Sequence, residues 1–338
     1  MKRILVTGGA GFIGSNLVEA LLARGDEVCA LDDLSTGRLT NIASFASHPR
    51  FRFVQGSVLD PDLVLSLVDR AEEVFHLAAS VGVRLIVSQP LHSIVNNVRG
   101  AENVLEAAHV AGGKPVILFS SSEVYGKGDG LPLRESDDTV IGPSSITRWG
   151  YAAGKLVDEF MAIAYHREHG LPVVIVRCFN TCGPRQLPDY GMVVPRFIGQ
   201  ALAGQPITVF GDGRQTRCFS YVGDVVRGVI LLSVASDAFG EVFNIGTDEE
   251  VTILDLAERV RRLSGSRSRV EIVPYEKAYP HGFEDLSRRV PDLTKIRDRV
   301  GYRAEVDLDT LLARTIEHHA AQRTPPRVAA AAQAQAGA

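Results

Sequence analysis

The beginning of this chain, residues 4 to 33, constrains its fold more than any other part of the sequence. Residues 4–6 form a short apolar run, which is typical of a buried parallel strand. Gly8, Gly11 and Gly14 follow at the spacing G-x-x-G-x-x-G. The first glycine allows a tight turn, the second lets backbone approach a pyrophosphate, and the third lets a helix pack against the strand. The pattern predicts a dinucleotide-binding βαβ unit.

An acidic residue closes this unit. A helix is expected over about residues 13–23, where free N–H groups and the positive dipole end would face a phosphate. The strand at 28–31 leads to Asp32, whose carboxylate is suited to both ribose hydroxyls and would repel a 2′-phosphate. Asp33 is the neighbouring candidate, and Arg38 is a nearby cation that would accommodate a phosphate. Because Asp32 ends the apolar run, we expect NAD rather than NADP.

Strands and helices alternate through the first half of the chain. Strand-like runs recur at 52–55, 73–77, 115–120 and 173–177, and helix-like runs separate them at 61–70, 94–111 and 151–168. This alternation predicts an α/β protein with a Rossmann-type, doubly wound parallel sheet. Ligands of such sheets bind at the carboxyl ends of the strands, so the best candidate residues follow each strand.

The composition of the sequence changes after residue 180, where glycine and proline become frequent. We predict a smaller C-terminal substrate-binding domain, formed by 181–223 and 248–320, beside an NAD-binding domain at 1–180. The segment 224–247 again indicates a helix and then a strand, and is expected to return to the main sheet. Residues 324–338 are rich in Ala and Gln without apolar periodicity, which predicts a disordered tail.

Composition and charge exclude several classes of function. The net charge of -4 gives no basic footprint for nucleic acid, and no apolar run is long enough to span a membrane. The N-terminus leads directly into a strand, so we expect no signal peptide. The four cysteines, Cys29, Cys178, Cys182 and Cys218, show no metal-site spacing. These features predict a cytoplasmic protein without a metal site and with reduced thiols.

Tyr151 and Lys155 are four residues apart in a predicted helix and therefore share one face. A tyrosine beside an ammonium group and an oxidised nicotinamide has its phenolate favoured, and can then remove a hydroxyl proton. Ser120 and residues 121–123 follow a strand expected to lie beside the cofactor, where a hydroxyl can bond the reacting oxygen. Such a tyrosine–lysine pair also occurs by chance on exposed helices, and serines often cap strand ends.

Seven sequence motifs occur in a characteristic order along the chain: TGGAGFIGSNL, HLAA, SSSEVYG, YAAGK, FNTCGPRQ, FGDGRQTRCFSYVGD and FNIG. Together they resemble the extended short-chain dehydrogenase/reductase superfamily, whose members oxidise nucleotide sugars at C4 with NAD. The resemblance covers roughly residues 1 to 320. The predicted cofactor-binding residues are Gly8, Gly11, Phe12, Ile13, Gly14, Asp32, Asp33, Gly37, Arg38, Ser57, Val58, Leu77, Ala78, Ala79, Asn97, Ser120, Tyr151 and Lys155.

The reaction that follows C4 oxidation differs between branches of this superfamily. Dehydratases resemble T-D-E-V-Y-G, but Ser122 occupies the position of their aspartate; Glu123 resembles the decarboxylases and is absent from typical 4-epimerases. Arg217 also matches a decarboxylase arginine. The resemblance is greatest to UDP-glucuronate decarboxylases, which implies loss of CO2 to give UDP-4-keto-pentose or UDP-xylose. The alternatives are an NDP-sugar 4-epimerase, on UDP-glucose or UDP-glucuronate, and then a 4,6-dehydratase. The predicted catalytic residues are Ser121, Ser122, Glu123, Tyr151, Lys155 and Arg217.

The resemblance also implies substrate contacts and a partner. Asn180 and Arg289 match residues that contact the nucleotide diphosphate, Phe210 lies where the uracil is held, and Arg84 could meet a charged substrate. Ordinary alternatives are a capped loop, a solvated face and a core aromatic. The predicted substrate-binding residues are Arg84, Asn180, Arg185, Phe210, Arg217 and Arg289.

Family members often form homodimers through the two helices expected here at 94–111 and 151–168. Gly154 departs from the usual serine or threonine before the lysine.

Overall fold

The computed structural model describes residues 1–128, 130–188, 191–275 and 288–323. Within these ranges, seven parallel strands form one sheet in the order β11-β6-β5-β4-β1-β2-β3. The strands are β1 (Arg3–Thr7), β2 (Glu27–Asp32), β3 (Phe51–Gln55), β4 (Glu73–His76), β5 (Val116–Ser121), β6 (Val173–Cys178) and β11 (Glu241–Ile245). The predicted Rossmann-type sheet is confirmed.

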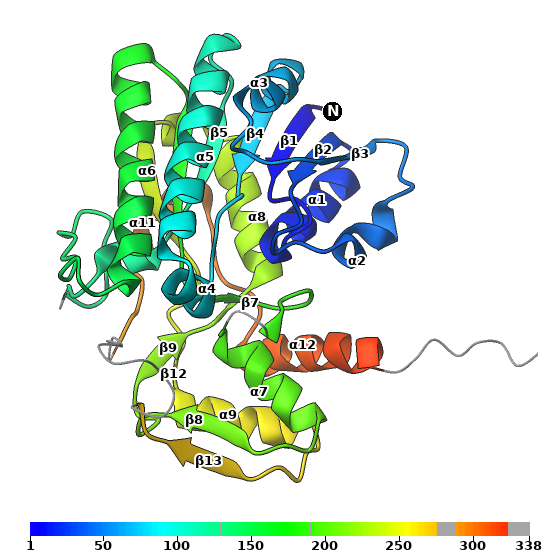
Figure 1. Cartoon of the computed structure of the whole chain (residues 1–338), viewed down its shortest axis with the longest axis vertical. Coiled ribbons are helices and arrows are strands. Elements are labelled where there is room, and N and C mark those ends of the chain that lie inside the picture. Colours follow the sequence, from blue (N-terminus) through cyan, green and yellow to red (C-terminus); the bar gives the residue numbers. More distant parts are fainter. Residues whose placement is uncertain (129, 189–190, 276–287, 324–338) are drawn as a thin grey trace, which may run out of the picture.

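Helices cover both faces of this sheet (Figure 1). On one face lie α1 (Phe12–Arg24), α8 (Val222–Ser233) and α11 (Thr294–Val300), which share an apolar core with the sheet. On the other lie α3 (Pro61–Arg70), α5 (Pro90–Val110) and α6 (Arg148–His169). Short helical turns are α2 (Leu39–Ile42), η1 (Ala43–Phe45), α4 (Val83–Ser88), η2 (Ser122–Tyr125) and η4 (Ser236–Ala238).

A smaller lobe lies below the carboxyl edge of the sheet in Figure 1 and has its own apolar core. Its strand pairs are β7 (Thr181–Cys182) with β10 (Ser220–Tyr221), β8 (Ile207–Phe210) with β13 (Val270–Val273), and β9 (Thr216–Cys218) with β12 (Glu250–Thr252). Its helices are α7 (Val193–Leu202), α9 (Ile253–Leu263) and α12 (Leu308–Arg323). The lobe thus faces the edge of the sheet where ligands bind in such folds.

Local sequence signals explain several element ends. Helix α3 has the predicted bounds, because the Asp60 side chain caps its start and a proline occupies its first turn. Helix α1 ends at Gly25 and α6 at Gly170, both with φ in the left-handed region. Helices α5 and α6 begin a few residues before their predicted starts.

The segment after residue 224 contributes most of α8 and then β11, which pairs in parallel with β6. The proposed boundaries between the two domains stay a prediction. The predicted disordered tail at 324–338 lies outside the described residues. In the described part of the chain, no helix combines the length and apolar character needed to cross a membrane.

Candidate active site

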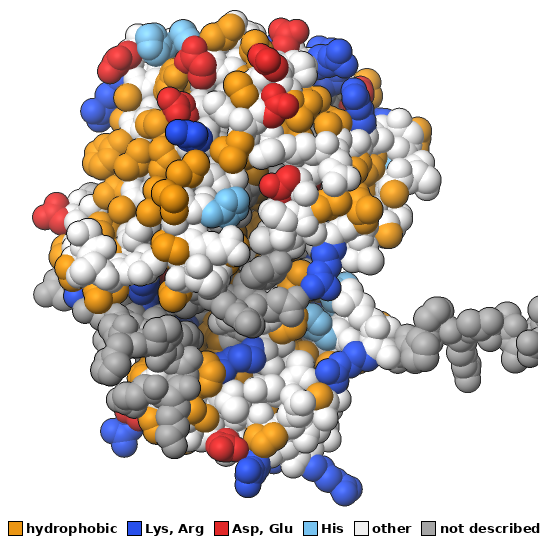
Figure 2. Space-filling view, in the orientation of Figure 1, with side chains coloured by type: hydrophobic (Ala, Val, Ile, Leu, Met, Phe, Trp, Pro, Cys, Tyr) orange, Lys and Arg blue, Asp and Glu red, His pale blue; other side chains and the backbone are white. Residues whose placement is uncertain are grey.

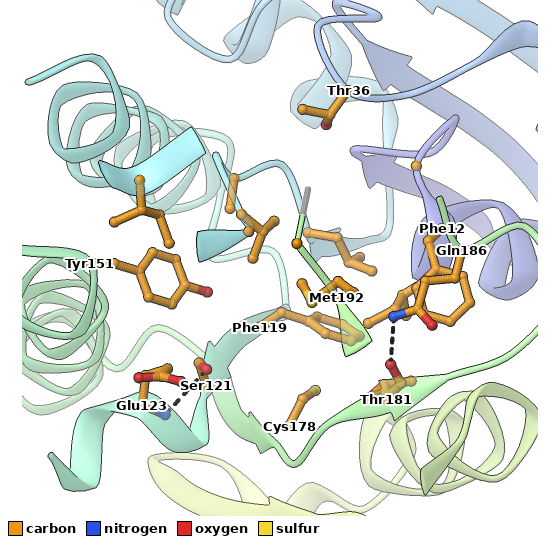
Figure 3. A pocket seen from close by; sticks show the side chains of 18 of the residues that line it. Phe12, Thr36, Phe119, Ser121, Glu123, Tyr151, Cys178, Thr181, Gln186 and Met192 are labelled. Carbon is orange, nitrogen blue, oxygen red and sulfur yellow. Dashed lines mark hydrogen bonds between the residues drawn. The ribbon is translucent and has the colours of Figure 1, made fainter. Parts of the chain in front are cut away.

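A cavity of about 460 Å³ lies between the carboxyl edge of the sheet and the smaller lobe. Its walls come from the glycine turn before α1, the ends of β2, β4, β5 and β6, the start of α6, and the smaller lobe. Figure 3 shows side chains from both parts of the protein directed into it. The cavity therefore occupies the place where a doubly wound sheet binds its ligands.

The glycine turn at one end of the cavity is shaped for a dinucleotide. Gly8 has φ of 71°, and a Cβ atom there would lie 2.9 Å from the backbone nitrogen of Ala78. A Cβ atom on Gly14 would collide with the carbonyl oxygen of Gly8. Helix α1 starts after Gly11 without a side-chain cap, so its first N–H groups are directed at any ligand in the turn. The turn thus fits the pyrophosphate of NAD.

Asp32 stands at the end of β2 and is buried beside this turn. Its carboxylate accepts the backbone N–H of Ala10 at 2.9 Å and of Leu34 at 2.8 Å. Burial raises the pKa of Asp32, and these hydrogen bonds oppose the rise. Asp33 also lines the cavity, whereas Arg38 does not. Two acidic side chains at the predicted ribose position favour NAD over NADP.

Tyr151 and Lys155 line the cavity from the first turns of α6. Lys155 is 3% exposed, and its Nζ donates to the Phe119 carbonyl and to Asp158, both at 3.1 Å. Burial and the negative charge of Glu123 raise the pKa of Tyr151. Asp158 pairs with Lys155, and Glu123 opposes ionisation of the phenol, so the phenolate expected beside an oxidised nicotinamide stays a prediction.

Ser121 and Glu123 lie at the same end of the cavity as Tyr151 (Figure 3). The Ser121 Oγ accepts the Glu123 backbone N–H at 3.2 Å and is hydrogen-bonded to Tyr151, a contact that lowers the phenol's pKa. Ser120 also lines the cavity, but its hydroxyl donates to Glu159 beneath it at 2.5 Å. The hydroxyls of Ser121 and Tyr151 can therefore act on one substrate oxygen.

Two arginines hold Glu123. Arg289 Nη1 lies 2.8 Å from one carboxylate oxygen, and Arg148 Nη2 lies 3.2 Å from the other. Although burial opposes ionisation, these two charges lower the pKa of Glu123 to about 2. Arg289 Nη1 also contacts the buried Ser122 at 3.3 Å. At neutral pH the site thus presents two positive charges around one carboxylate, next to the Tyr151 hydroxyl.

The resemblance implies that Arg289 contacts the diphosphate, which stays a prediction; in the structure its guanidinium contacts Glu123 and Ser122. The sequence alternative of a solvated face is excluded for Arg289, which is buried. Arg185 lines the cavity but pairs with Glu19 of α1 at 2.7 Å, which puts it on the cofactor side. The Arg84 side chain lies outside the described residues.

The other predicted substrate residues come from the smaller lobe and line the cavity together. Asn180 donates to the Cys218 carbonyl at 3.0 Å, and Arg217 is mostly buried in β9. The guanidinium of Arg196 lies 3.8 Å from the centre of the Phe210 ring. An aromatic ring and two arginines therefore line the wall of the cavity that the smaller lobe supplies.

Most of the predicted cofactor residues are brought together, but four lie outside the cavity wall. Asn97 is buried and accepts the Ser80 backbone N–H at 2.7 Å, so it supports the loop after β4. Ser57 caps the turn before α3, and Gly37 and Arg38 lie behind Asp32 and Ala10. The residues that line the cavity are Gly8, Gly11, Phe12, Ile13, Gly14, Asp32, Asp33, Val58, Leu77, Ala78, Ala79, Ser120, Tyr151 and Lys155.

Several cavity residues were missing from the predicted set. Arg148 precedes Tyr151 by one helical turn, and this spacing could have revealed it. Arg196 on α7 and Gln215 gave no local signal; Gln215 donates to the Phe210 carbonyl at 2.9 Å and to the Tyr275 hydroxyl at 3.0 Å. These residues reach the cavity only through the packing of the smaller lobe.

Comparisons with known proteins agree with this geometry. The chain is 41% identical to the UDP-N-acetyl-alpha-D-glucosaminuronate decarboxylase of Bacillus cytotoxicus, over 94% of this chain and 97% of that protein. It is 37% identical to UDP-glucuronic acid decarboxylase 1 of Arabidopsis thaliana, over 93% of this chain and 69% of that protein.

Among solved structures, the dTDP-glucose 4,6-dehydratase of Streptomyces venezuelae, which was determined with NAD bound, is 33% identical. It superposes with a TM-score of 0.86 over 95% of this chain and 98% of its own. The UDP-glucose 4-epimerase of Thermotoga maritima, solved with UDP-glucose, is 31% identical with a TM-score of 0.85, over 95% and 99%. Residues 4–246 match the model of one family. The chain therefore belongs to the NAD dependent epimerase/dehydratase family.

Proposed function

We propose that this protein is an NAD-dependent decarboxylase of UDP-glucuronate, which yields UDP-4-keto-pentose or UDP-xylose. The observation that carries the proposal is the carboxylate of Glu123 held between Arg148 and Arg289, next to Tyr151. The relatives named above as decarboxylases support the same reading. The fold alone does not distinguish the reactions, since similar structures include an epimerase and a dehydratase.

The cofactor would be held by the glycine turn, the N-terminus of α1 and Asp32. This assignment rests on the close approach that Gly8 and Gly14 allow, on the uncapped N–H groups of α1 and on solved relatives that contain NAD. Bound NAD supplies the hydride acceptor for oxidation at C4 and a positive charge near the phenol of Tyr151.

The side chains act on the oxygen at C4. Tyr151 removes the proton of the C4 hydroxyl, and Ser121 donates a hydrogen bond to the same oxygen. Once C4 is a ketone, the C6 carboxylate is β to it, so the C5–C6 bond breaks, CO2 leaves and the electron pair becomes an enolate. The Tyr151 and Ser121 hydroxyls stabilise the oxyanion of that enolate. A proton from water at C5 then gives UDP-4-keto-pentose, and UDP-xylose forms when the hydride returns to C4 and Tyr151 returns the proton to its oxygen.

The positive charge of the two arginines favours a substrate that carries a carboxylate. Arg148 and Arg289 give the sugar end one more positive charge than Glu123 neutralises. Glu123, whose pKa the two arginines lower, orients the arginines and the sugar.

A second substrate is favoured by one observation. The Bacillus cytotoxicus relative, at 41% identity, is named for UDP-N-acetyl-alpha-D-glucosaminuronate, which carries the same C6 carboxylate. The chemistry at C4 and C6 would be identical for both sugars. The two candidates differ only in the group at C2, so a direct competition between them decides the preference.

The test is incubation of the purified protein with each of the two UDP-sugar acids, followed by mass spectrometry. Loss of CO2 supports the proposal, and the product mass distinguishes a pentose from a 4-keto pentose. An unchanged mass with a shifted retention time would mean 4-epimerisation. UDP-glucose is incubated in parallel, and loss of water from it would mean dehydration. Tyr151→Phe is the matched inactive control, because it keeps the ring and removes the phenol.

We also propose a homodimer that forms through α5 and α6. These helices pack side by side in Figure 1, and Figure 2 shows hydrophobic side chains gathered over them. Leu91 and Ile94 on α5 are exposed, as are Val157 and Phe160 on α6. An apolar face of this kind commonly marks an interface. A cytoplasmic location is proposed as well, and the four free thiols agree with a reducing compartment.

A further inference from the structure

Two residues of the sequence motifs have no role in the site described so far: Tyr125, in SSSEVYG, and Asn244, in FNIG. They lie 119 residues apart, yet the Tyr125 hydroxyl donates to Asn244 Oδ1 at 2.7 Å. Both side chains are buried, and neither belongs to the described lining of the cavity. Because an incompletely bonded polar group is costly in the interior, the remaining partners of this pair show what it holds.

On one side, the Asn244 side chain hydrogen-bonds the segment that follows Arg289. The side-chain nitrogen of Asn244 donates to the carbonyl oxygens of Leu133 at 2.9 Å and Asp292 at 3.3 Å. The Leu133 N–H donates to the Val290 carbonyl at 2.8 Å, and its own carbonyl accepts the Asp292 N–H at 2.7 Å. These hydrogen bonds therefore fix residues 290–292, which directly follow Arg289.

On the other side, Tyr125 is connected through Arg177 of β6 to α6, the helix that carries Tyr151 and Lys155. The guanidinium of Arg177 lies 4.7 Å from the centre of the Tyr125 ring. Arg177 Nη2 is 2.7 Å from Glu159 of α6, and the same carboxylate accepts the Ser120 hydroxyl. The Tyr125–Asn244 bond thus joins α6 to the segment 290–292.

We propose that the Tyr125–Asn244 hydrogen bond is a positioning contact that sets Arg289 against Glu123. The inference deepens the proposed function and rests on it only for its kinetic consequence. Arg289 directly precedes residues 290–292, so a shift of these residues displaces its guanidinium from the Glu123 carboxylate. A displacement of about 1 Å at reacting groups can cost roughly 100-fold in rate.

The first variant is Tyr125→Phe, which removes the hydroxyl with its bonds to Asn244 and Arg177 and keeps the ring beside the Arg177 guanidinium. The matched control is Tyr302→Phe, because Tyr302 is equally buried and its hydroxyl donates to the Gly246 carbonyl at 2.8 Å. Tyr302→Phe removes one buried hydrogen bond near the end of β11, whereas Tyr125→Phe removes the bond to Asn244 and the contact with Arg177, so its melting temperature should fall at least as much. The double variant with Arg289→Ala then separates the link to Arg289 from the loss of the Arg177 contact.

The decisive readout is the pKa of Glu123, followed by carbon NMR of labelled glutamate side chains and assigned with Glu123→Gln. In Tyr125→Phe this pKa should rise, because Arg289 supplies part of the charge that lowers it. In Tyr302→Phe it should stay low. In an Arg289→Ala background, adding Tyr125→Phe should cause no further rise, since the effect passes through Arg289.

Kinetics give a second readout. Tyr125→Phe should lower kcat for UDP-glucuronate roughly 10- to 100-fold with little change in KM, while Tyr302→Phe leaves both near wild type. If the wild-type protein releases no CO2, the proposed function fails, but the Glu123 pKa still decides this inference. An equal Glu123 pKa in both tyrosine variants would overturn it. If Tyr125→Phe does not fold, Asn244→Ser makes the same test from the other partner.

Discussion

Arg289 and Glu123 are 166 residues apart in the sequence, and an Arg289 guanidinium nitrogen lies 2.8 Å from the Glu123 carboxylate. Arg148 completes the arrangement from the opposite side at 3.2 Å. A carboxylate between two guanidinium groups stays ionised across the neutral range. This ion-pair cluster is the feature that sets the sugar end of the cavity apart from a simple alcohol-oxidising site, and it makes the stability of the protein sensitive to acid.

The contribution of Glu123 to stability should depend on pH with a definite sign. Its pKa is lowered from 4.5 to about 2, so its stabilising effect is fully present above about pH 4.5 and is lost as the pH falls through 2. We expect urea unfolding to show a constant deficit for Glu123→Gln above about pH 5 and a shrinking deficit below it. A deficit that does not change between pH 7 and the acid limit of folding would contradict the assigned ion pairs.

Alanine substitutions at Gly14, in the cofactor turn, and at Gly199, in α7, should have opposite effects. Gly14→Ala should weaken NAD binding by 10-fold or more, on the order of 1.4 kcal/mol, because its Cβ would collide with the Gly8 carbonyl in the cofactor turn. Gly199→Ala, in the middle of α7, meets no atom within 4 Å and should stabilise the protein by about 0.5–1 kcal/mol. Calorimetric titration with NAD and thermal melts would measure both. Equal NAD affinity in Gly14→Ala would count against the assigned cofactor site.

Local patterns were sufficient to predict the fold. The glycine spacing, the apolar runs and the alternation of strands with helices each depend on residues close in sequence, and the parallel sheet follows from them. The same holds for the tyrosine and lysine on α6, since a spacing of four places them on one helical face. These features needed no knowledge of how the smaller lobe packs.

The contacts of the site could be predicted only in part. Asn97 was expected at the cofactor, but it supports the backbone of the loop after β4, and a motif cannot tell a ligand contact from the residue behind it. The pairing of Arg289 with Glu123 depends on how residues 290–292 pack, which no local pattern encodes. Lys155 lies in its expected place, but the neutralising carboxylate of Asp158, three residues on, was overlooked.

The proposed dimer can be tested at one exposed side chain. Phe160 on α6 is 64% exposed, and Phe160→Glu would place a charge in the centre of the proposed interface. We expect this variant to be monomeric, or at least 10-fold weaker in association, by sedimentation equilibrium. Val234→Glu is the control, since Val234 is 63% exposed at the end of α8. Monomeric wild-type protein, or a dimer that survives Phe160→Glu unchanged, would exclude this interface.

Asp158 should contribute to the pH at which Tyr151 becomes a base, after the larger effects of burial and Glu123. Its charge is one of the causes that raise the pKa of Tyr151, and it also neutralises Lys155 at 3.1 Å. Since the phenolate is the form that removes the C4 proton, kcat/KM should rise with pH in the wild-type enzyme. Asp158→Asn removes the negative charge while Asn can still accept from Lys155, so the Tyr151 pKa should fall and the rising limb should move to lower pH. Asp255→Asn, at an exposed ion pair on α9, should leave the profile in place. A limb that stays fixed or moves to higher pH in Asp158→Asn would show that Asp158 does not control this tyrosine.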